Sequence, residues 1–284
     1  MEADALLRSV IEDRIQQCEN QYRITNTAFL DLHQRTLTEE ICRSIPGLRW
    51  GFYGGFPGAE RVIAVFFPDY VDLEATDGSQ TAGAEDFTEP KTKAAEQEQR
   101  ICGYFRQNPE DDPLELIKIS VPKGSRTLSH RDYLGSLLGL GLKRETTGDI
   151  LVREQSADIM ILKDIGEFVE YNYTKAGRTS LSVTRCRPEE CQPPALRIQR
   201  RSDTVSSLRL DNLTASAFSV SRSKAAEAIR SGQVFVNHME ALKADAVLQE
   251  GDRISWRGKG KVCLEEVGGK SRKDRIFVVF IKYV

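Results

Sequence analysis

Four short stretches in the C-terminal part of the chain decide the fold: Arg209-Leu210-Asp211, Ser221-Arg222-Ser223-Lys224-Ala225, Gly232-Gln233-Val234-Phe235-Val236-Asn237 and Gly251-Asp252. The pattern predicts two short helices followed by a small sheet. The polar side chains of these predicted elements are mainly cationic. A cationic surface on such a frame is suited to holding a phosphate backbone.

The second predicted helix has clear limits at both ends. Ser221 is a good N-cap, the residues after it are good helix formers, and Gly232 supplies the C-terminal stop. Arg222 and Lys224 lie in the first turn, beside free backbone N–H groups and the positive end of the helix dipole. Together these groups predict an anion site, for which phosphate is the obvious ligand.

The segment after this helix predicts strands and a basic hairpin. Val234 and Val236 alternate as in a half-buried strand, a turn at Gly251-Asp252 precedes another strand, and residues 276–284 form a β-branched and aromatic run. The cations between these strands are Arg257, Lys259, Lys261, Lys270, Arg272, Lys273 and Arg275. Such a run alone favours a solvated loop. Next to the cationic helix, it favours a hairpin that binds RNA.

The charge of the chain is unevenly distributed. The net charge of −2 and the pI near 6.1 would by themselves argue against a nucleic-acid partner. However, residues 1–121 hold 12 Lys and Arg against 22 Asp and Glu, residues 122–204 hold 14 against 11, and residues 205–284 hold 14 against 9. An acidic front and a basic back would orient the protein on RNA, because the local field steers association.

Two groups of motifs resemble known families. The C-terminal stretches resemble, nearly position for position, the S-four domain, a small RNA-binding module of a small-subunit ribosomal protein. Where that family usually turns on Asn-Gly, this chain has Asn237-His238, which predicts a wider turn. Upstream, the stretches His130-Arg131-Asp132-Tyr133-Leu134-Gly135, Gly139-Leu140-Gly141-Leu142-Lys143-Arg144 and Gly148-Asp149-Ile150 resemble the signature of the YlmH family of bacterial S-four proteins.

The resemblance extends over about residues 45–284 and implies a function. The YlmH family is understood as ribosome-associated RNA binders that act on obstructed large subunits still holding peptidyl-tRNA. By resemblance, this chain is expected to bind rRNA and tRNA on the large ribosomal subunit.

The composition excludes several other classes of protein. With 40% hydrophobic and 29% charged residues in 284, the chain can build two or three compact domains. No apolar run approaches the roughly 20 residues that span a bilayer, and Met1-Glu2-Ala3-Asp4 lacks a signal-peptide pattern, so we expect a cytoplasmic protein with no membrane partner. The six cysteines form no Cys-x-x-Cys pair and no histidine lies near Cys186 or Cys191, so we expect neither metal nor cofactor.

The first 75 residues predict helices and a β-hairpin. Leu7, Val10, Ile11, Ile15 and Cys18 share one helical face, and further helices are predicted over residues 28–34 and 39–43. Residues 48–56 and 61–67, separated by Pro57-Gly58, predict the hairpin. Residues 76–98, rich in Thr, Ala, Gly, Glu and Gln, are interpreted as a flexible insertion or linker.

Residues 99–204 alternate between strand and helix patterns. Strands are predicted over 114–121, 149–152, 158–162 and 180–184, with helices from Ser129 and over 165–173. Ser129 and Asp132 form a start like a capping box. The order strand-helix-strand-strand-helix-strand predicts a ferredoxin-like (RRM-like) α/β plait, which we interpret as a second RNA-binding domain.

The glycine-rich motif of this plait leaves its role open. Gly135, Gly139 and Gly141 cost helix stability, so they favour the close approach of either RNA backbone or another helix. His130 and Arg131 at the helix start could contact phosphate, or they could be plain surface residues. The same two interpretations apply to Arg144.

An RNA-modifying enzyme is the alternative class. Arg209-Leu210-Asp211-Asn212-Leu213-Thr214 resembles the Arg-Leu-Asp-x-x-Thr loop of pseudouridine synthases, but the residues after Asp211 all match the S-four pattern and leave no room for a catalytic domain. In the S-four interpretation Arg209 starts the first helix and Leu210 and Leu213 pack inward. A methyltransferase would need a glycine-rich loop between a strand and a helix, and the glycines at 135–141 follow no predicted strand.

The sequence therefore predicts a noncatalytic α+β RNA-binding protein, expected to be a monomer. Its parts are residues 1–75, the linker 76–98, the plait 99–204 and the S-four domain 205–284. The candidate RNA-binding residues are Arg209, Ser221, Arg222, Lys224, Arg230, Asn237, Lys243, Arg257, Lys259, Lys261, Arg272, Lys273, His130, Arg131 and Arg144.

Overall fold

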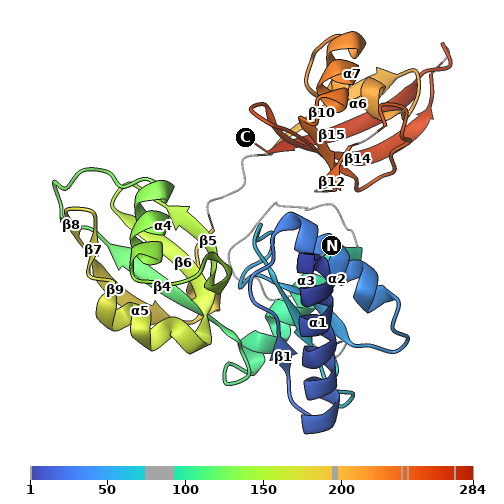
Figure 1. Ribbon diagram of the computed structural model, residues 1–284. Coiled ribbons are helices and arrows are strands. Elements are labelled where there is room, and N and C mark those ends of the chain that lie inside the picture. The colour runs from blue at the N-terminus through green and yellow to red at the C-terminus, as the bar shows by residue number, and fades with distance from the viewer. Residues whose placement is uncertain are drawn as a thin grey trace. The chain divides into compact units, whose positions relative to one another are not determined.

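The computed structural model describes residues 2–73, 93–193, 198–237, 239–241, 243–271 and 273–283. The chain divides into two compact units, Met1–Pro194 and Ala195–Val284 (Figure 1). Helices and sheets are combined in an α+β fold, as predicted. The sequence placed a domain boundary at 204/205, but residues 198–205 form a strand of the C-terminal sheet. Most of the predicted insertion, as well as His238 and Arg272, lies outside the described residues.

The N-terminal part packs three helices around a small antiparallel sheet. Its elements are α1 (Glu2–Gln21), β1 (Thr25–Asn26), α2 (Leu32–Arg43), β2 (Trp50–Tyr53), β3 (Ile63–Phe66) and α3 (Lys93–Gln107). The predicted hairpin is confirmed, because β2 pairs with β3 from Trp50↔Phe66 to Tyr53↔Ile63. On α1, Ile11, Ile15 and Cys18 are buried as predicted, whereas Val10 is exposed.

The two helices predicted over 28–34 and 39–43 are replaced by the single helix α2. Asp31 is its N-cap and forms a capping box with Gln34. Phe29 and Leu30 lie before the helix in extended backbone, where Leu30 bridges to Val62. Their burial explains the apolar pattern that resembled a helix, because Phe29 is 1% exposed.

The predicted plait is present. Its elements are β4 (Leu114–Ser120), α4 (His130–Gly139), β5 (Thr147–Val152), β6 (Ser156–Leu162), α5 (Gly166–Asn172) and β9 (Ser182–Cys186), with the short 3-10 turns η1 (Arg144–Thr146), η2 (Lys163–Ile165) and η3 (Pro188–Glu190) and the hairpin β7 (Lys175–Ala176) and β8 (Thr179–Ser180). The antiparallel order β5-β6-β4-β9 is that of a ferredoxin-like plait. Ser129 caps α4 in a capping box with Asp132, as predicted.

One face of the plait sheet is covered by α4 and α5, and most of the other face by the N-terminal part. On one face, Ile117 and Ile159 pack with Tyr133 of α4 and Val169 of α5. The other face carries Leu114, Leu116 and Met160, which are at most 1% exposed and pack against the N-terminal part: Phe29, Tyr53, Phe56, Ile101 and Phe105. The segment after β9 also contacts that face, through an ion pair from Glu190 to Lys118 and a hydrogen bond from Arg153 to the Gln192 carbonyl, whereas Ser120, Ser182 and Thr184 at its end are exposed.

The C-terminal unit consists of two helices on one side of a curved sheet (Figure 1). The elements are β10 (Ile198–Val205), α6 (Leu210–Ala217), α7 (Arg222–Arg230), β11 (Val234–Val236), β12 (Met239–Glu240), β13 (Arg253–Trp256), β14 (Gly260–Lys270) and β15 (Ile276–Tyr283). The strand order is β10-β15-β14-β13-β11-β12. Leu210 and Leu213 of α6 are fully buried with Ile254, Val278 and Phe280 of the sheet, so the predicted inward side of α6 is confirmed.

Candidate nucleic-acid interface

Two arginines in the C-terminal unit hold the same buried carboxylate. Asp211, in the first turn of α6, is 5% exposed. Arg222, the first residue of α7, donates from Nε to Oδ2 at 3.0 Å and from Nη2 to Oδ1 at 3.2 Å. Arg209, the N-cap of α6, donates to the same oxygens at 3.3 and 3.2 Å. The start of α7 is thereby fixed to the start of α6.

The charge balance of this cluster favours an anion. Burial by itself would raise the pKa of Asp211, but the hydrogen bonds from Arg209 and Arg222 outweigh burial and hold that pKa below its usual range. Asp211 is therefore ionised at neutral pH and cancels one of the two guanidinium charges. Both arginines keep a large exposed area, 40% of the Arg209 side chain and 50% of the Arg222 side chain. Arg209, Asp211 and Arg222 taken together therefore keep one positive charge, in a fixed place at the surface.

The first turn of α7 adds further donors beside this pair. The Ser221 hydroxyl accepts from the Lys224 backbone N–H at 3.3 Å, which confirms the predicted N-cap. The N–H groups of Arg222 and Ser223 are in the first turn, where a helix offers no acceptor of its own. Lys224 is exposed, and no ion-pair partner for it occurs in the described part of the chain. Arg222, Lys224 and these N–H groups can bind a phosphate together.

At the start of α6, a loop already accepts the hydrogen bonds of the first backbone N–H groups. The N–H groups of Leu210 and Asp211 donate to the carbonyls of Ala246 and Ala244, at 2.8 and 2.9 Å. The predicted residue Lys243 belongs to this loop and is exposed. The free helix start of the cluster is therefore that of α7.

The predicted basic hairpin is two separate turns. Arg257 and Lys259 lie in the turn between β13 and β14, and Lys261 follows in β14. Lys273 lies in the turn between β14 and β15, at the other end of an 11-residue strand. At about 3.3 Å per residue the two turns are about 35 Å apart. The sequence could not separate them, because nothing in the basic run indicates where the intervening strand pairs.

The cations of the first turn stack on aromatic rings. The guanidinium carbon of Arg257 lies 4.8 Å from the centre of the Phe235 ring, and Nζ of Lys259 lies 4.5 Å from that of Trp256. These contacts hold the side chains against the sheet. In the other turn, Lys270 pairs with Asp274 at 2.7 Å and Arg275 binds Thr204 of β10. The first turn therefore presents ordered cations, whereas Lys270 and Arg275 in the second are already engaged.

Two other predicted contacts have local structural partners. Asn237 has a φ of +48° and links two turns: its side chain donates to Asp252 at 2.7 Å and accepts from the Arg253 N–H at 2.9 Å. Val236 of β11 pairs with Met239 of β12, and the predicted wider turn includes His238, which lies outside the described residues. Arg230 is exposed at the C-terminal end of α7, where it binds the Ala226 carbonyl at 3.2 Å.

The plait residues divide into exposed and internal ones. His130 and Arg131 are exposed at the start of α4. Arg144 instead turns inward and donates to the carbonyls of Thr147 and Gly148, so its interpretation as a structural residue is favoured. An added Cβ on Gly135 or Gly139 would meet no atom within 4 Å in the described part of the chain. No described helix of the same unit therefore packs against those two glycines.

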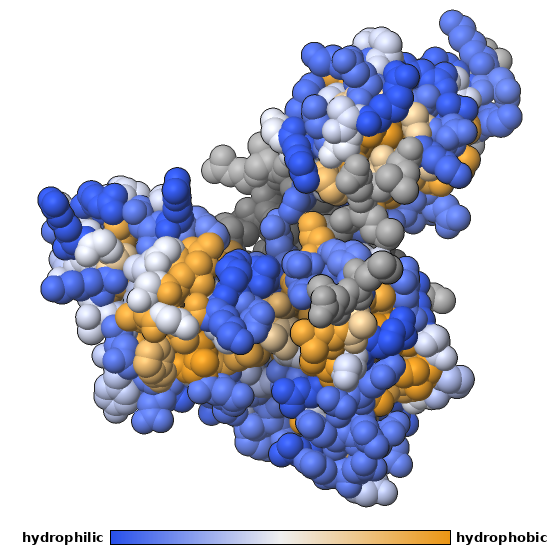
Figure 2. All heavy atoms as spheres, viewed as in Figure 1, coloured by the Kyte–Doolittle hydropathy of each residue, from blue (hydrophilic) through white to orange (hydrophobic). Residues whose placement is uncertain are grey.

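Two of the cysteines, Cys42 and Cys191, lie in surroundings that disfavour a thiolate. Burial raises the pKa of Cys42 to about 12 and that of Cys191 to about 12, so neither is a ready thiolate. Within the described residues, His, Cys, Asp and Glu form no group that could hold a metal ion. None of the described helices is long and apolar enough to span a membrane. In Figure 2, hydrophilic residues dominate the visible face of the C-terminal unit, at the upper right.

Comparisons with known proteins match both units. Residues 108–190 match the family model "Putative RNA-binding domain in YlmH", and residues 208–254 match the S4 domain, the module called S-four above. The chain is 31% identical over 265 residues to the ribosome-associated protein quality control protein P2 of Bacillus subtilis, covering 92% of this chain and 88% of that protein. A solved structure, the cell division protein ylmH from Streptococcus pneumoniae, has 23% identity and a TM-score of 0.44 and covers 67% of this chain and 95% of that chain.

Proposed function

Because the chain belongs to the YlmH family of S4-domain proteins, we propose that it is a noncatalytic RNA-binding protein of ribosome-associated quality control. In this role it binds rRNA and tRNA, as a cytoplasmic monomer, on obstructed large subunits that still carry peptidyl-tRNA. The name of the Bacillus subtilis relative, which covers nearly the whole chain, supports the ribosomal setting.

One observation carries the RNA-binding part of the proposal: Arg209 and Arg222 are held in place by Asp211 beside the first turn of α7. Preorganised cations lose little conformational freedom when a phosphate binds. The surrounding charge points the same way, since residues 195–284 hold 17 Lys and Arg against 10 Asp and Glu, a net charge of +7. Such a unit attracts the phosphates of structured RNA without reading base edges.

The plait is proposed to contact RNA as well, through the surface of its helix α4 and not through its sheet. RRM domains stack bases on the open face of the sheet, but here most of that face, around Leu114, Leu116 and Met160, is buried against the N-terminal part. The RRM-like mode of binding is therefore replaced by contacts at the start of α4. Arg131, Gly135 and Gly139 follow one another at a spacing of four on that helix, and the two glycines leave room for a backbone from outside.

The noncatalytic part of the proposal is supported by Asp211. In the loop of a pseudouridine synthase that it resembles, the aspartate must reach the nucleotide. In this chain the aspartate is buried and holds two arginines, and Thr214 of the same stretch is fully buried. A cofactor bound to the purified protein would instead favour the RNA-modifying enzyme.

The experiment that tests the proposal is sedimentation of the full chain with ribosomal particles. Large subunits with peptidyl-tRNA, large subunits without tRNA, and small subunits are run in parallel gradients. We expect the strongest comigration with the first, weaker comigration with the second and none with the third. Equal comigration with both kinds of subunit, or none with either, would sink the ribosomal role. A steep loss of RNA binding with salt would still support binding to RNA in general.

A further inference from the structure

Polar side chains continue the buried face of the C-terminal sheet. On β15, Val278 and Phe280 point into the core, and Lys282 follows at the strand spacing of two. On β10, Val205 is buried in the same core, and Arg201 and Gln199 lie on its side of the strand. Polar residues at core-facing positions break the binary pattern, which is expected where a site has a function.

The register of the sheet brings these side chains together. Gln199 pairs with Lys282, and Arg201 pairs with Phe280. On the other side of β15, Lys282 pairs with Val262 of β14. The resulting rows lie beyond the C-terminal end of α6, where the helix no longer covers the sheet.

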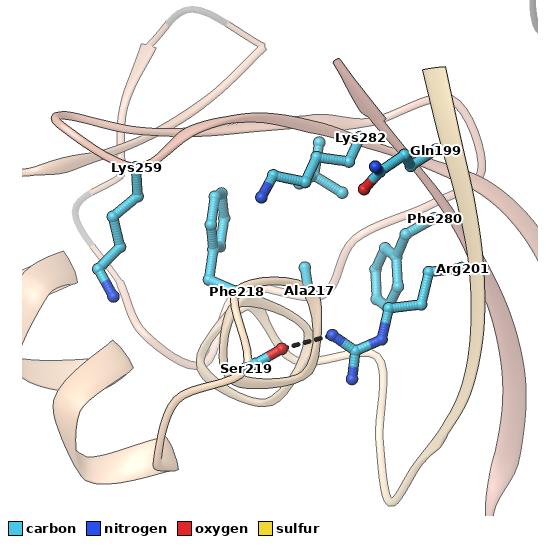
Figure 3. Close-up of a pocket in the computed structure, with 9 residues that line it drawn as sticks. Gln199, Arg201, Ala217, Phe218, Ser219, Lys259, Phe280 and Lys282 are labelled. Atoms are coloured by element: carbon cyan, nitrogen blue, oxygen red, sulfur yellow. Dashed lines mark hydrogen bonds between the residues drawn. The ribbon is translucent and has the colours of Figure 1, made fainter. Parts of the chain in front are cut away.

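A cavity of about 350 Å³ opens at this place. Ala217, Phe218 and Phe280 give it apolar walls, and Arg201, Lys259 and Lys282 bring three cations to it. Figure 3 shows the Phe218 ring between Lys259 on one side and Arg201 on the other, with the Lys282 side chain extending towards the ring. The volume falls within the range of sites for small organic ligands.

The cavity has an excess of positive charge. None of the described residues that line it is acidic. Arg201 donates to the neutral Ser219 hydroxyl, and its ion pair with Asp203 is long, at 4.0 Å. Within the described residues, Lys282 has no ion-pair partner. A concave surface with uncompensated cations attracts an anion.

We propose that this cavity holds one unpaired nucleotide of an RNA bound to the C-terminal unit. Arg201 and Lys282 bind its phosphate, the base lies against Phe218, and the Gln199 amide is placed to hydrogen-bond the base. Aromatic rings with adjacent cations are the usual means of holding single-stranded bases. The inference rests on the proposed RNA-binding function and adds a site separate from the cluster of Arg209, Asp211 and Arg222.

The test compares two labelled RNA hairpins that differ by one feature. One is blunt, and the other carries four unpaired nucleotides at its 3′ end. We expect the full-length protein to bind the extended hairpin at least about five-fold more tightly, given the strength of base stacking on aromatic residues. Arg201→Gln and Lys282→Gln should each remove most of this preference without changing the affinity for the blunt hairpin.

Arg200→Gln is the matched control. Arg200 is the next residue of β10, points to the other face and pairs with Glu265 at 2.7 Å, so the substitution changes the charge equally but outside the cavity. It should leave the preference for the extended hairpin intact. An extension made of abasic nucleotides should lose the preference, because it offers phosphates but no base.

The outcomes separate this site from the proposed function. Failure to bind either hairpin sinks RNA binding itself. Tight binding of the blunt hairpin with no gain from the extension overturns the nucleotide site alone. An equal loss with Arg200→Gln and Arg201→Gln, or a full gain from the abasic extension, reduces the effect to general charge. If micromolar uridine monophosphate or adenosine monophosphate abolishes the preference for the extended hairpin completely, the cavity is a site for a free nucleotide and the proposal for an RNA nucleotide is overturned.

Discussion

At the scale of single residues, the three cations near the start of α7 differ in what they hold. Arg209 and Arg222 both serve a buried carboxylate, so each contributes to the fold as well as to the surface charge. Lys224 is exposed and serves only the surface. The sequence suggested that Arg222 and Lys224 were equivalent exposed contacts. Only the fold reveals that Asp211 connects Arg222 to the first helix.

This difference predicts that only one of two substitutions in α7 lowers the stability of the protein. Arg222→Ala leaves Asp211 with one partner and should lower the free energy of unfolding by about 1–2 kcal/mol, a value reduced from that of a buried pair because the arginine is half exposed. Lys224→Ala should leave stability unchanged and weaken RNA binding. Urea denaturation and RNA titration at one salt concentration measure both effects, with Arg230→Ala as a control at the far end of the helix. An unchanged denaturation curve for Arg222→Ala would contradict the role of Asp211.

Asp112 predicts a pH dependence in the N-terminal unit. Burial raises its pKa to about 6, although the Leu114 N–H and the Tyr53 hydroxyl, both at 2.9 Å, donate to its carboxylate. Between pH 4 and 6 the folded state binds more protons than the unfolded state, so stability falls as pH rises through this window. The free energy of unfolding should change by about 3 kcal/mol, because the pKa of Asp112 is about 6 in the folded state and near 3.8 in the unfolded state.

Asp112→Asn should flatten this part of the stability curve. Asp111→Asn changes the neighbouring, exposed residue and is the matched control. Urea denaturation at several pH values from 4 to 7 measures both variants. If the Asp112→Asn curve keeps the slope of the wild type, another group is responsible.

At the scale of elements, β10 completes the C-terminal unit. All eight of its residues pair with β15, and Val205 is 1% exposed in the core. Residues 198–284 should therefore fold alone, whereas residues 206–284 should lose the outer pairing of β15 and fail to give dispersed amide signals by NMR. Dispersed spectra from both fragments would mean that the S4 core does not need this strand.

Sequence patterns predicted the individual helices and strands better than the pairing between distant strands. The cap at Ser221, the buried side of α6 and the order of the plait follow from local spacing, and all are present. Pairings that depend on distant strands were not predictable. β10 is an example, because its core-facing positions carry Arg201 and Gln199, which look like those of a surface segment until β15 lies beside them.

At the scale of the whole molecule, the N-terminal part and the plait share one hydrophobic core. Phe29 is the clearest link, because an added Cβ on Gly148 would lie 2.6 Å from its ring and Met160 packs in the same cluster. Gly148 of the family motif thus leaves room for the Phe29 ring. Part of the motif therefore serves the packing of the core. The sequence treated residues 1–75 and 99–204 as separate domains, whereas the structure makes them one compact unit.

Shared packing predicts that residues 1–193 unfold together. Phe29→Ala should lower the free energy of unfolding by about 3–5 kcal/mol, as for other buried phenylalanines. Calorimetry of this fragment should show one transition that moves as a whole. A second transition that stays in place in the variant would show that the plait is stable without its cover.

The length of β14 also limits the size of a partner. Its two terminal turns carry cations about 35 Å apart, at roughly 3.3 Å per residue over 11 residues. An RNA shorter than this distance can reach only one turn, and only an extended one can bridge both. The length of the strand therefore sets a minimum length for an RNA that binds both turns. The affinity for RNA fragments of increasing length should rise in two steps. The second rise should occur at the length at which one RNA molecule contacts both Lys259 and Lys273.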